Sequence, residues 1–187
     1  MGVLFIDACM RKQSRTRRLA EALLRKLDQP YETVRLEEMA FPAMDEAFLA
    51  KRDRIAGGEG SEDPDFAPAR QFAAAETIVI AAPYWDLSFP AVLKQYLEQV
   101  CVTGITFRYG ADGVPTGLCA ARRLYYVTTA GGPWAPDEYG FGYVKAVAQG
   151  YFGIQDVRQL RALGLDVDGA DPEAILEAAE AEIEAVL

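Results

Sequence analysis

Histidine is absent from the 187-residue chain. Its absence excludes Ser-His and Cys-His nucleophile pairs, imidazole proton shuttles and the histidine ligands of common metal centres. We therefore expect no metal site. Any chemistry should be carried by a cofactor, by a phosphate-binding loop, or by carboxylates and tyrosines.

Cysteine is scarce, because Cys9, Cys101 and Cys119 are the only three in the chain. Their odd number and spacing fit neither a disulfide framework nor a zinc site, and we interpret Cys101 and Cys119 as small buried hydrophobic residues. Long apolar runs are missing as well, which argues against a membrane-spanning helix. The first residues show neither a basic leader nor a cleavage site, so the expected location is the cytoplasm.

Basic residues are outnumbered, with 19 Lys and Arg against 28 Asp and Glu and a net charge of −9. Such a balance repels nucleic acids and anionic membranes, so we expect neither as a partner. A hydrophobic share of 51% over 187 residues predicts a soluble, globular chain that forms one domain, residues 1–187. Against this acidic background, basic residues gather at one place, between positions 11 and 18.

Apolar runs alternate with amphipathic segments along the chain. Strands are expected at residues 3–6, 31–36, 77–82, 124–129 and 157–163. Helices are expected at 16–27, 45–55, 66–75, 89–100, 141–152 and from 171 onward. This alternation predicts an α/β fold with a doubly wound, five-stranded parallel sheet of strand order 2-1-3-4-5.

Two stretches exceed what simple crossover connections need. One lies near residues 40–70, and the other, residues 103–118, reads as a hairpin with its turn at Asp112-Gly113. Insertions of this kind often line a site or a partner surface.

The loops that follow the first, third and fourth strands should meet, because ligands bind beyond the carboxyl ends of parallel strands where the strand order reverses. The first of these loops, "CMRKQSRT", contains Arg11, Ser14, Arg15 and Thr16 and leads into a helix N-terminus. Hydroxyls, guanidinium groups and unpaired N–H groups at a helix N-terminus favour a phosphate. A capped helix with a solvated basic face explains the same residues equally well.

The first loop also matches the Cys-x5-Arg signature of low-molecular-weight cysteine phosphatases, through Cys9, Arg15 and the following Thr16. Asp171 could imitate their general acid. However, the tight cradle around a thiolate normally needs Gly or Asn, and residues 10–14 contain neither. This alternative also leaves the other two loops unexplained.

The second loop contains Pro83, Tyr84, Trp85, Asp86 and Leu87. Two adjacent aromatic side chains cannot both enter one core, so we expect the exposed one to contact a planar ligand.

The third loop contains Thr129, Ala130, Gly131 and Gly132. A glycine pair lets the backbone approach a ligand closely and donate N–H groups, although a plain turn fits this loop as well. A flat ring with a phosphate tail would satisfy all three loops.

Three segments carry a resemblance to a known group: "IVIAAPYWDLSFPAVLKQYLEQV" (78–100), "GITFRYGADG" (104–113) and "VTTAGGP" (127–133). They resemble the FMN-dependent NAD(P)H:quinone oxidoreductases and azoreductases of the flavodoxin-like fold. The resemblance implies an enzyme that passes a hydride from NADH or NADPH, through flavin N5, to a quinone or azo acceptor. It also implies a homodimer with the ring at the subunit boundary, in which residues 40–70 and 103–118 form dimer or pocket-wall elements.

The resemblance also assigns roles by position. Ser14, Arg15 and Thr16 match the loop that holds the FMN phosphate, 83–87 the loop beside the isoalloxazine ring, and 129–132 the backbone around its pyrimidine edge. Tyr139 takes a hydroxyl role near the ring. Asp86 departs from the pattern, since azoreductases usually carry Asn there. A flavodoxin-like electron carrier is the alternative, although the "GITFRYG" segment is unusual for one.

Overall fold

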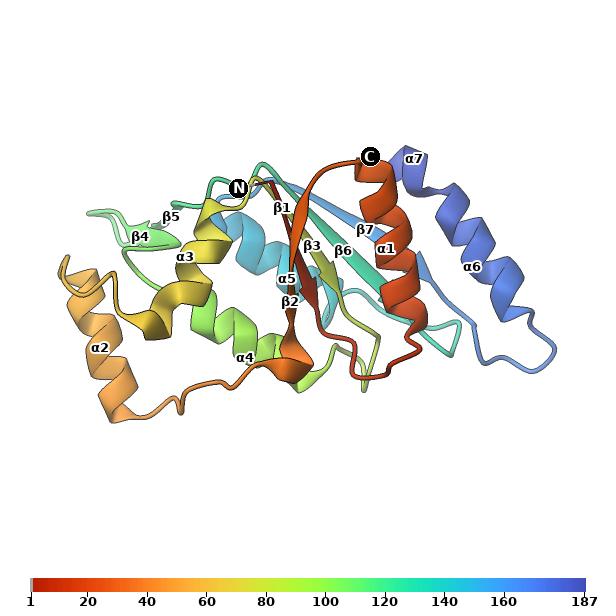
Figure 1. Cartoon of the computed structure of the whole chain (residues 1–187), viewed down its shortest axis with the longest axis horizontal. Helices are drawn as coiled ribbons and strands as arrows, with labels where there is room; N and C mark the ends of the chain where they lie inside the picture. Colours follow the sequence, from red (N-terminus) through yellow and green to blue (C-terminus); the bar gives the residue numbers. More distant parts are fainter. Residues whose placement is uncertain (1) are drawn as a thin grey trace.

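A five-stranded parallel sheet forms the centre of the computed structural model, which describes residues 2–187 (Figure 1). Its strands are β1 (Val3–Asp7), β2 (Tyr31–Arg35), β3 (Thr77–Ala81), β6 (Arg123–Thr129) and β7 (Asp156–Ala162). They lie in the order β2-β1-β3-β6-β7. The order predicted from the sequence is thereby confirmed, since β4 and β5 form a separate pair outside this sheet.

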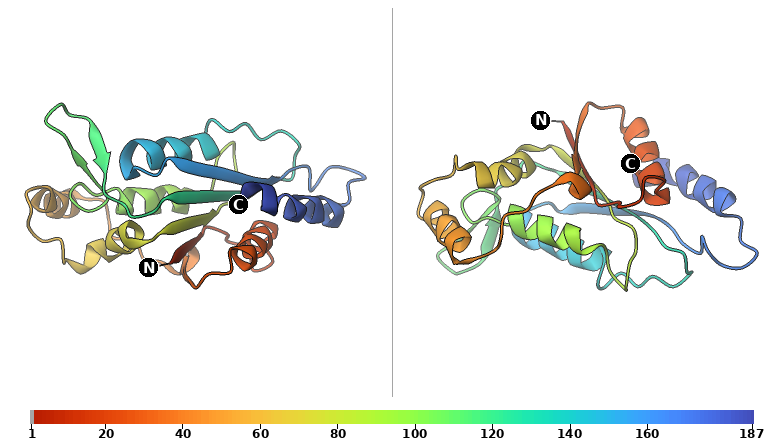
Figure 2. Two further views of the ribbon diagram at one scale, coloured as in Figure 1. Left: turned by 90° about the horizontal axis from the view of Figure 1, so that it is seen from above. Right: turned by 60° about the horizontal axis from the view of Figure 1, so that its bottom comes forward.

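Helices cover both faces of the sheet, as Figure 2 shows for α1 and α5 on opposite sides. Alternate residues of each strand face opposite helix layers. Val3 and Phe5 pack in the layer of α1 (Arg15–Leu27), α6 (Pro172–Ala181) and α7 (Ile183–Val186). Leu4 and Ile6 pack in the layer of α3 (Ala67–Ala74), α4 (Ala91–Val100) and α5 (Phe141–Val147). Both faces are therefore buried, which explains the continuous apolar runs of the strands.

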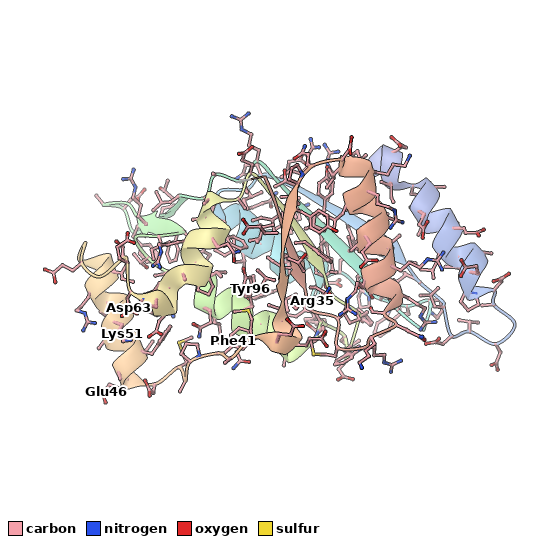
Figure 3. The ribbon with its side chains drawn as sticks, viewed as in Figure 1. Arg35, Phe41, Glu46, Lys51, Asp63 and Tyr96 are labelled. Atoms are coloured by element: carbon pink, nitrogen blue, oxygen red, sulfur yellow. The ribbon has the colours of Figure 1, made fainter. Side chains whose placement is uncertain are left out.

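The segment near residues 40–70 contains η1 (Leu36–Glu38), α2 (Glu46–Ala56) and η2 (Pro64–Phe66). Phe48 and Phe66 join the same core layer as α3 and α4, with their ring centroids 5.4 Å apart. Lys51 pairs with Asp63 at 3.3 Å, and Figure 3 labels both side chains. This segment is thus a packed extension of one helix layer.

The hairpin predicted at 103–118 is confirmed as β4 (Phe107–Tyr109) and β5 (Pro115–Gly117). Gly113 in its turn has φ +76°, a conformation that favours glycine. The hairpin packs on η3 (Ala148–Phe152), where a Cβ on Gly117 would lie 2.2 Å from the Phe152 carbonyl carbon. The helix predicted over 141–152 is confirmed in its bounds, and its second half, η3, is π-helical.

The strands of the sheet end at a common level. Asp7, Ala81 and Val127 are register partners, and the N–H groups of Ala8 and Ala82 continue the pairing beyond Asp7 and Ala81. The loops after β1, β3 and β6 therefore leave from one edge. Within residues 2–187, no helix has the length and apolar character to cross a membrane, and no cluster of three or more His, Cys, Asp or Glu side chains could hold a metal ion.

Candidate cofactor site

A cavity of about 220 Å³ lies at the edge where these loops meet. It is lined by Met10, Arg11, Gln13, Ser14, Arg15, Thr16, Pro83, Tyr84, Trp85, Thr129 and Asp166. The loops after β1 and β3 meet here as the sequence predicts, whereas Thr129 lines the cavity from the end of β6 and Asp166 from the loop after β7. Met10, Gln13 and Asp166 are lining residues that sequence reasoning missed.

The loop between β1 and α1 offers unpaired main-chain donors. Within the described residues, none of the N–H groups from Met10 to Thr16 donates a hydrogen bond to the protein. Ser14 is the N-cap of α1, and its Oγ accepts a hydrogen bond from the Arg17 N–H at 3.2 Å. The helix-cap interpretation and the anion-site interpretation are thus compatible, because the cap uses the Ser14 side chain and leaves the main-chain N–H groups before it unpaired.

Arg15 is bound within the protein. Its guanidinium forms a two-pronged ion pair with Asp166, at 2.8 and 3.1 Å, and also donates to the Leu165 carbonyl. These hydrogen bonds hold the pKa of the Asp166 carboxyl below its ordinary value. The Asp166 carboxylate therefore neutralises the Arg15 guanidinium, which the sequence predicts to bind a phosphate. The sequence signal for Asp166 is its position just after the last strand, at the carboxyl edge of the sheet.

A side-chain hydrogen bond joins Thr16, in the first turn of α1, to Thr129, at the end of β6. Both are buried, and their Oγ1 atoms lie 2.6 Å apart. One hydroxyl proton is used in this hydrogen bond, so the other remains able to donate to a ligand.

The loop after β3 forms a tight two-residue turn. Trp85 and Ser88 exchange both main-chain hydrogen bonds, at 3.0 and 2.7 Å, around Asp86 and Leu87. Asp86 (φ +50°) and Leu87 (φ +69°) both adopt the left-handed conformation, which is unfavourable for leucine and typical of strained functional loops. Neither lines the cavity.

The two aromatic residues of this loop behave differently, as expected. Trp85 is 41% exposed at the cavity. The Tyr84 hydroxyl is buried without a partner among the described residues, beside an enclosed space of about 10 Å³ that Tyr126 and Thr128 also line. This space is about the size that one water molecule needs.

The glycines of the loop after β6 contact the chain beyond β7, and their approach to a ligand stays a prediction. Ala130, Gly131 and Gly132 do not line the cavity, and they pair with the chain beyond β7: the Asp166 N–H donates to Gly131 and the Gly164 N–H to Gly132. A Cβ on Gly131 would lie 2.3 Å from Asp166 Oδ2, so the close approach is to this carboxylate. Neither Gly131 nor Gly132 has a positive φ.

Tyr139 lies outside the cavity lining, and the residue is 62% exposed. Its carbonyl oxygen accepts a hydrogen bond from Ser88 Oγ at 2.6 Å, which ties the segment after β6 to the turn at 86–87. The structure thus gives Tyr139 a backbone contact with the second loop and no hydroxyl contact with the cavity.

A family model described as the flavodoxin-like fold matches residues 1–187. The chain belongs to this family. An FMN-dependent NADH:quinone oxidoreductase of Streptococcus suis is 31% identical over 163 residues, which cover 83% of this chain and 79% of that protein. FMN-dependent NADH:quinone oxidoreductase 2 of Clostridium acetobutylicum is 43% identical over 124 residues, 64% of this chain, and the match spans about three fifths (61%) of that relative's length.

Solved structures agree with the fold of this flavodoxin-like protein. An FMN-dependent NADH-azoreductase from Bacillus anthracis, solved in complex with FMN, superposes with a TM-score of 0.81 at 24% identity, covering 98% of this chain and 96% of that one. The relatives confirm the resemblance to FMN-dependent quinone oxidoreductases drawn from the sequence motifs, and this structure agrees with the flavodoxin-like fold.

Cys9 of this flavodoxin-like protein is unsuited to nucleophilic catalysis. Its side chain is 1% exposed, lies near the Ala81 carbonyl and does not line the cavity. Burial, reinforced by the Asp7 carboxylate, raises the pKa of the Cys9 thiol far above its ordinary range. The cysteine phosphatase alternative needs an accessible thiolate and is therefore rejected.

Proposed function

We propose that the protein is an FMN-dependent oxidoreductase that transfers a hydride from NADH or NADPH to a quinone or azo acceptor. The observation that carries this proposal is the row of unpaired N–H groups at the N-terminus of α1, beside a cavity built from three loops, in a chain of this family. A helix N-terminus with unpaired donors attracts phosphate, the one dianionic part of FMN.

The donors present fit a phosphate. The N–H groups of Met10–Thr16 are unpaired, and the Thr16–Thr129 pair retains one hydroxyl proton. Arg11 also lines the cavity and has no ion-pair partner among the described residues. An anion with several acceptor oxygens would satisfy this set, whereas a neutral apolar ligand would leave it unpaired.

The flat part of the ligand requires more room than the cavity of one chain provides. Its volume of about 220 Å³ is below the ~300–1,000 Å³ typical of small-molecule sites. We therefore assign the cavity to the phosphate and its tail, and the surface along Pro83–Trp85 to the ring. Leu87 in the loop after β3, and Trp134 and Tyr139 in the segment after β6, have exposed side chains. We propose that a second copy of the chain covers these three side chains in a homodimer.

When bound, FMN supplies a centre that accepts and releases hydride, so the chain needs no acid–base residue of its own for that step. The protein's part is to bind the phosphate, orient the ring and exclude water. Gly131 and Gly132 have unpaired N–H groups, and we propose that they stabilise negative charge on the reduced ring. Asp86 counteracts this effect because it adds a carboxylate to the same loop cluster.

Absorption spectroscopy and a turnover assay test this proposal. The purified protein, supplied with FMN, should show a bound-flavin spectrum, and it should oxidise NADH or NADPH steadily when a quinone is present. Bound FMN without NAD(P)H oxidation would instead indicate an electron carrier that depends on a separate reductase. Failure to take up FMN would contradict the proposal outright.

A further inference from the structure

The main-chain N–H groups from Met10 to Ser14 have no acceptor among the described residues, although this loop contains no glycine. Main-chain N–H groups usually gather on one side where glycine allows left-handed turns. No residue of this loop has a positive φ among the described residues. Some other group must therefore hold the peptide planes in place.

Arg17 supplies that group. Its Nη2 donates to the Cys9 carbonyl at 2.8 Å, and its Nη1 donates to the carbonyls of Arg11 and Lys12 at 3.0 and 3.2 Å. In a trans peptide, the C=O of one residue and the N–H of the next point in opposite directions. Holding these three carbonyls on the guanidinium therefore turns the N–H groups of Met10, Lys12 and Gln13 away from it.

The remaining contacts fix Arg17 on the side away from the ligand. Its Nε pairs with Asp7 at 2.5 Å, and Nη2 also reaches Glu37 at 3.4 Å. The Asp7 side chain is fully buried, accepts the Cys9 N–H at 3.0 Å, and has Arg35 at 3.6 Å, which Figure 3 labels at the end of β2. Two carboxylates and two guanidinium groups thus balance in this cluster.

Arg17 has no donor left for a ligand. A guanidinium has five N–H groups, and the acceptors just described on Asp7, Cys9, Arg11, Lys12 and Glu37 account for all five. Arg17 also does not line the cavity, whereas Met10 and Gln13 do. Its effect on a bound phosphate must therefore pass through the main chain.

We propose that Arg17 is the positioning residue of the phosphate site: its planar fork orders the Cys9–Gln13 main chain so that the N–H groups face the FMN phosphate. The inference rests on the proposed function, since it concerns the same cofactor. Lysine keeps the charge but offers its donors from a single atom, so it cannot hold three carbonyls in this arrangement.

Comparing FMN with riboflavin tests this role, because riboflavin lacks only the phosphate. Dissociation constants of both flavins should be measured for the apo-forms of the wild-type protein, Arg17→Lys and Arg18→Lys. Arg18 is the matched control, since it is the next residue of α1 and its guanidinium binds Glu173 and Glu180 on the other side of the helix. Melting temperatures of the same proteins identify general destabilisation, which would weaken the binding of both flavins together.

The preference for FMN over riboflavin should fall about tenfold or more in Arg17→Lys and stay at the wild-type value in Arg18→Lys. An unchanged preference in Arg17→Lys would overturn the inference while leaving the proposed function intact. A wild-type protein that binds neither flavin would overturn both. If Arg17→Lys does not fold, the uncharged pair Asp7→Asn with Arg17→Gln replaces it, with the same two outcomes.

Discussion

Thr16 Oγ1 and Thr129 Oγ1 lie 2.6 Å apart in the interior of the protein, 113 residues apart in the chain. This hydrogen bond joins the first turn of α1 to the end of β6. It therefore fixes the start of α1 relative to the loop that follows β6.

Removing one hydroxyl of this pair should lower the free energy of unfolding by more than half of the loss caused by removing both. We expect Thr16→Val and Thr129→Val each to lower the free energy of unfolding by about 1–3 kcal/mol, because each leaves a buried hydroxyl unpaired. The double variant should lose less than the sum of the two. Urea unfolding of the four proteins measures this coupling, and strictly additive losses would show that the two hydroxyls do not interact.

Asp166 should weaken FMN binding, because its carboxylate neutralises Arg15 at the cavity. We expect Asp166→Asn to bind FMN several-fold more tightly, with little change for riboflavin. Asp168→Asn is the matched control: it removes the same charge two residues away, where no ion pair is formed among the described residues. Weaker FMN binding by Asp166→Asn would mean that the carboxylate holds Arg15 in a productive position.

The glycines offer an independent way to move the same carboxylate. Gly131→Ala places a Cβ 2.3 Å from Asp166 Oδ2, so it should displace the carboxylate and shift FMN affinity in the direction of Asp166→Asn. Gly132→Ala meets nothing within 4 Å and should leave affinity unchanged. Titration with FMN compares the two, and equal effects would contradict this reading of Gly131.

Cys9 should be dispensable for turnover. Cys9→Ser keeps a small buried side chain, and we expect NAD(P)H oxidation to stay near the wild-type rate, with only a small loss of thermal stability. In the native protein, the Cys9 thiol should resist alkylation until unfolding, since burial raises its pKa. Loss of all activity in Cys9→Ser would restore the nucleophile interpretation.

Asp156 should make stability depend on pH in the acid range. Hydrogen bonds from Arg158 and Arg123 hold the pKa of its carboxyl below the ordinary value of 3.8. A lowered folded-state pKa adds stability above the ordinary value, and this stability is lost as pH falls through the folded-state pKa. We expect Asp156→Asn to cost at most about 1 kcal/mol at neutral pH, since the cluster is partly solvated, and progressively less as the pH falls below the ordinary pKa of the carboxyl.

Thermal unfolding across this pH range, compared with the wild-type protein, measures the effect. A difference between the two proteins that is independent of pH would show that the asparagine disturbs packing and that the charge has no part in it.

The order of the strands and the meeting of three loops could be predicted because they follow from local patterns. Runs such as residues 78–82 are apolar at every position, which occurs in parallel strands covered on both faces. Once the strands are parallel, the geometry of the sheet brings Thr16, Tyr84 and Thr129 together. The assignment of residues 1–187 to a single domain stays a prediction.

The partners of charged residues could not be predicted, because they depend on contacts far apart in the chain. Arg15 meets Asp166 across 151 positions, and nothing near Arg15 indicates that it is already paired. Gly131 illustrates the same limit: the missing Cβ was attributed to a ligand, whereas a side chain of the protein occupies the space. Arg17 was grouped with the basic residues of the loop, although its charge is balanced in the interior.

The proposed recognition of the phosphate through main-chain N–H groups makes the side chains of Met10, Lys12 and Gln13 dispensable for binding and leaves a charge contribution to Arg11 alone in this loop. Every amino acid except proline carries the N–H group that this site offers. The sequence of this loop can accordingly change during evolution without loss of the proposed phosphate site. Two residues would have to be retained: the arginine in the first turn of α1, Arg17, and the acid at the end of β1, Asp7. In distant members of such a lineage, those two residues would identify the site after the loop itself had become unrecognisable.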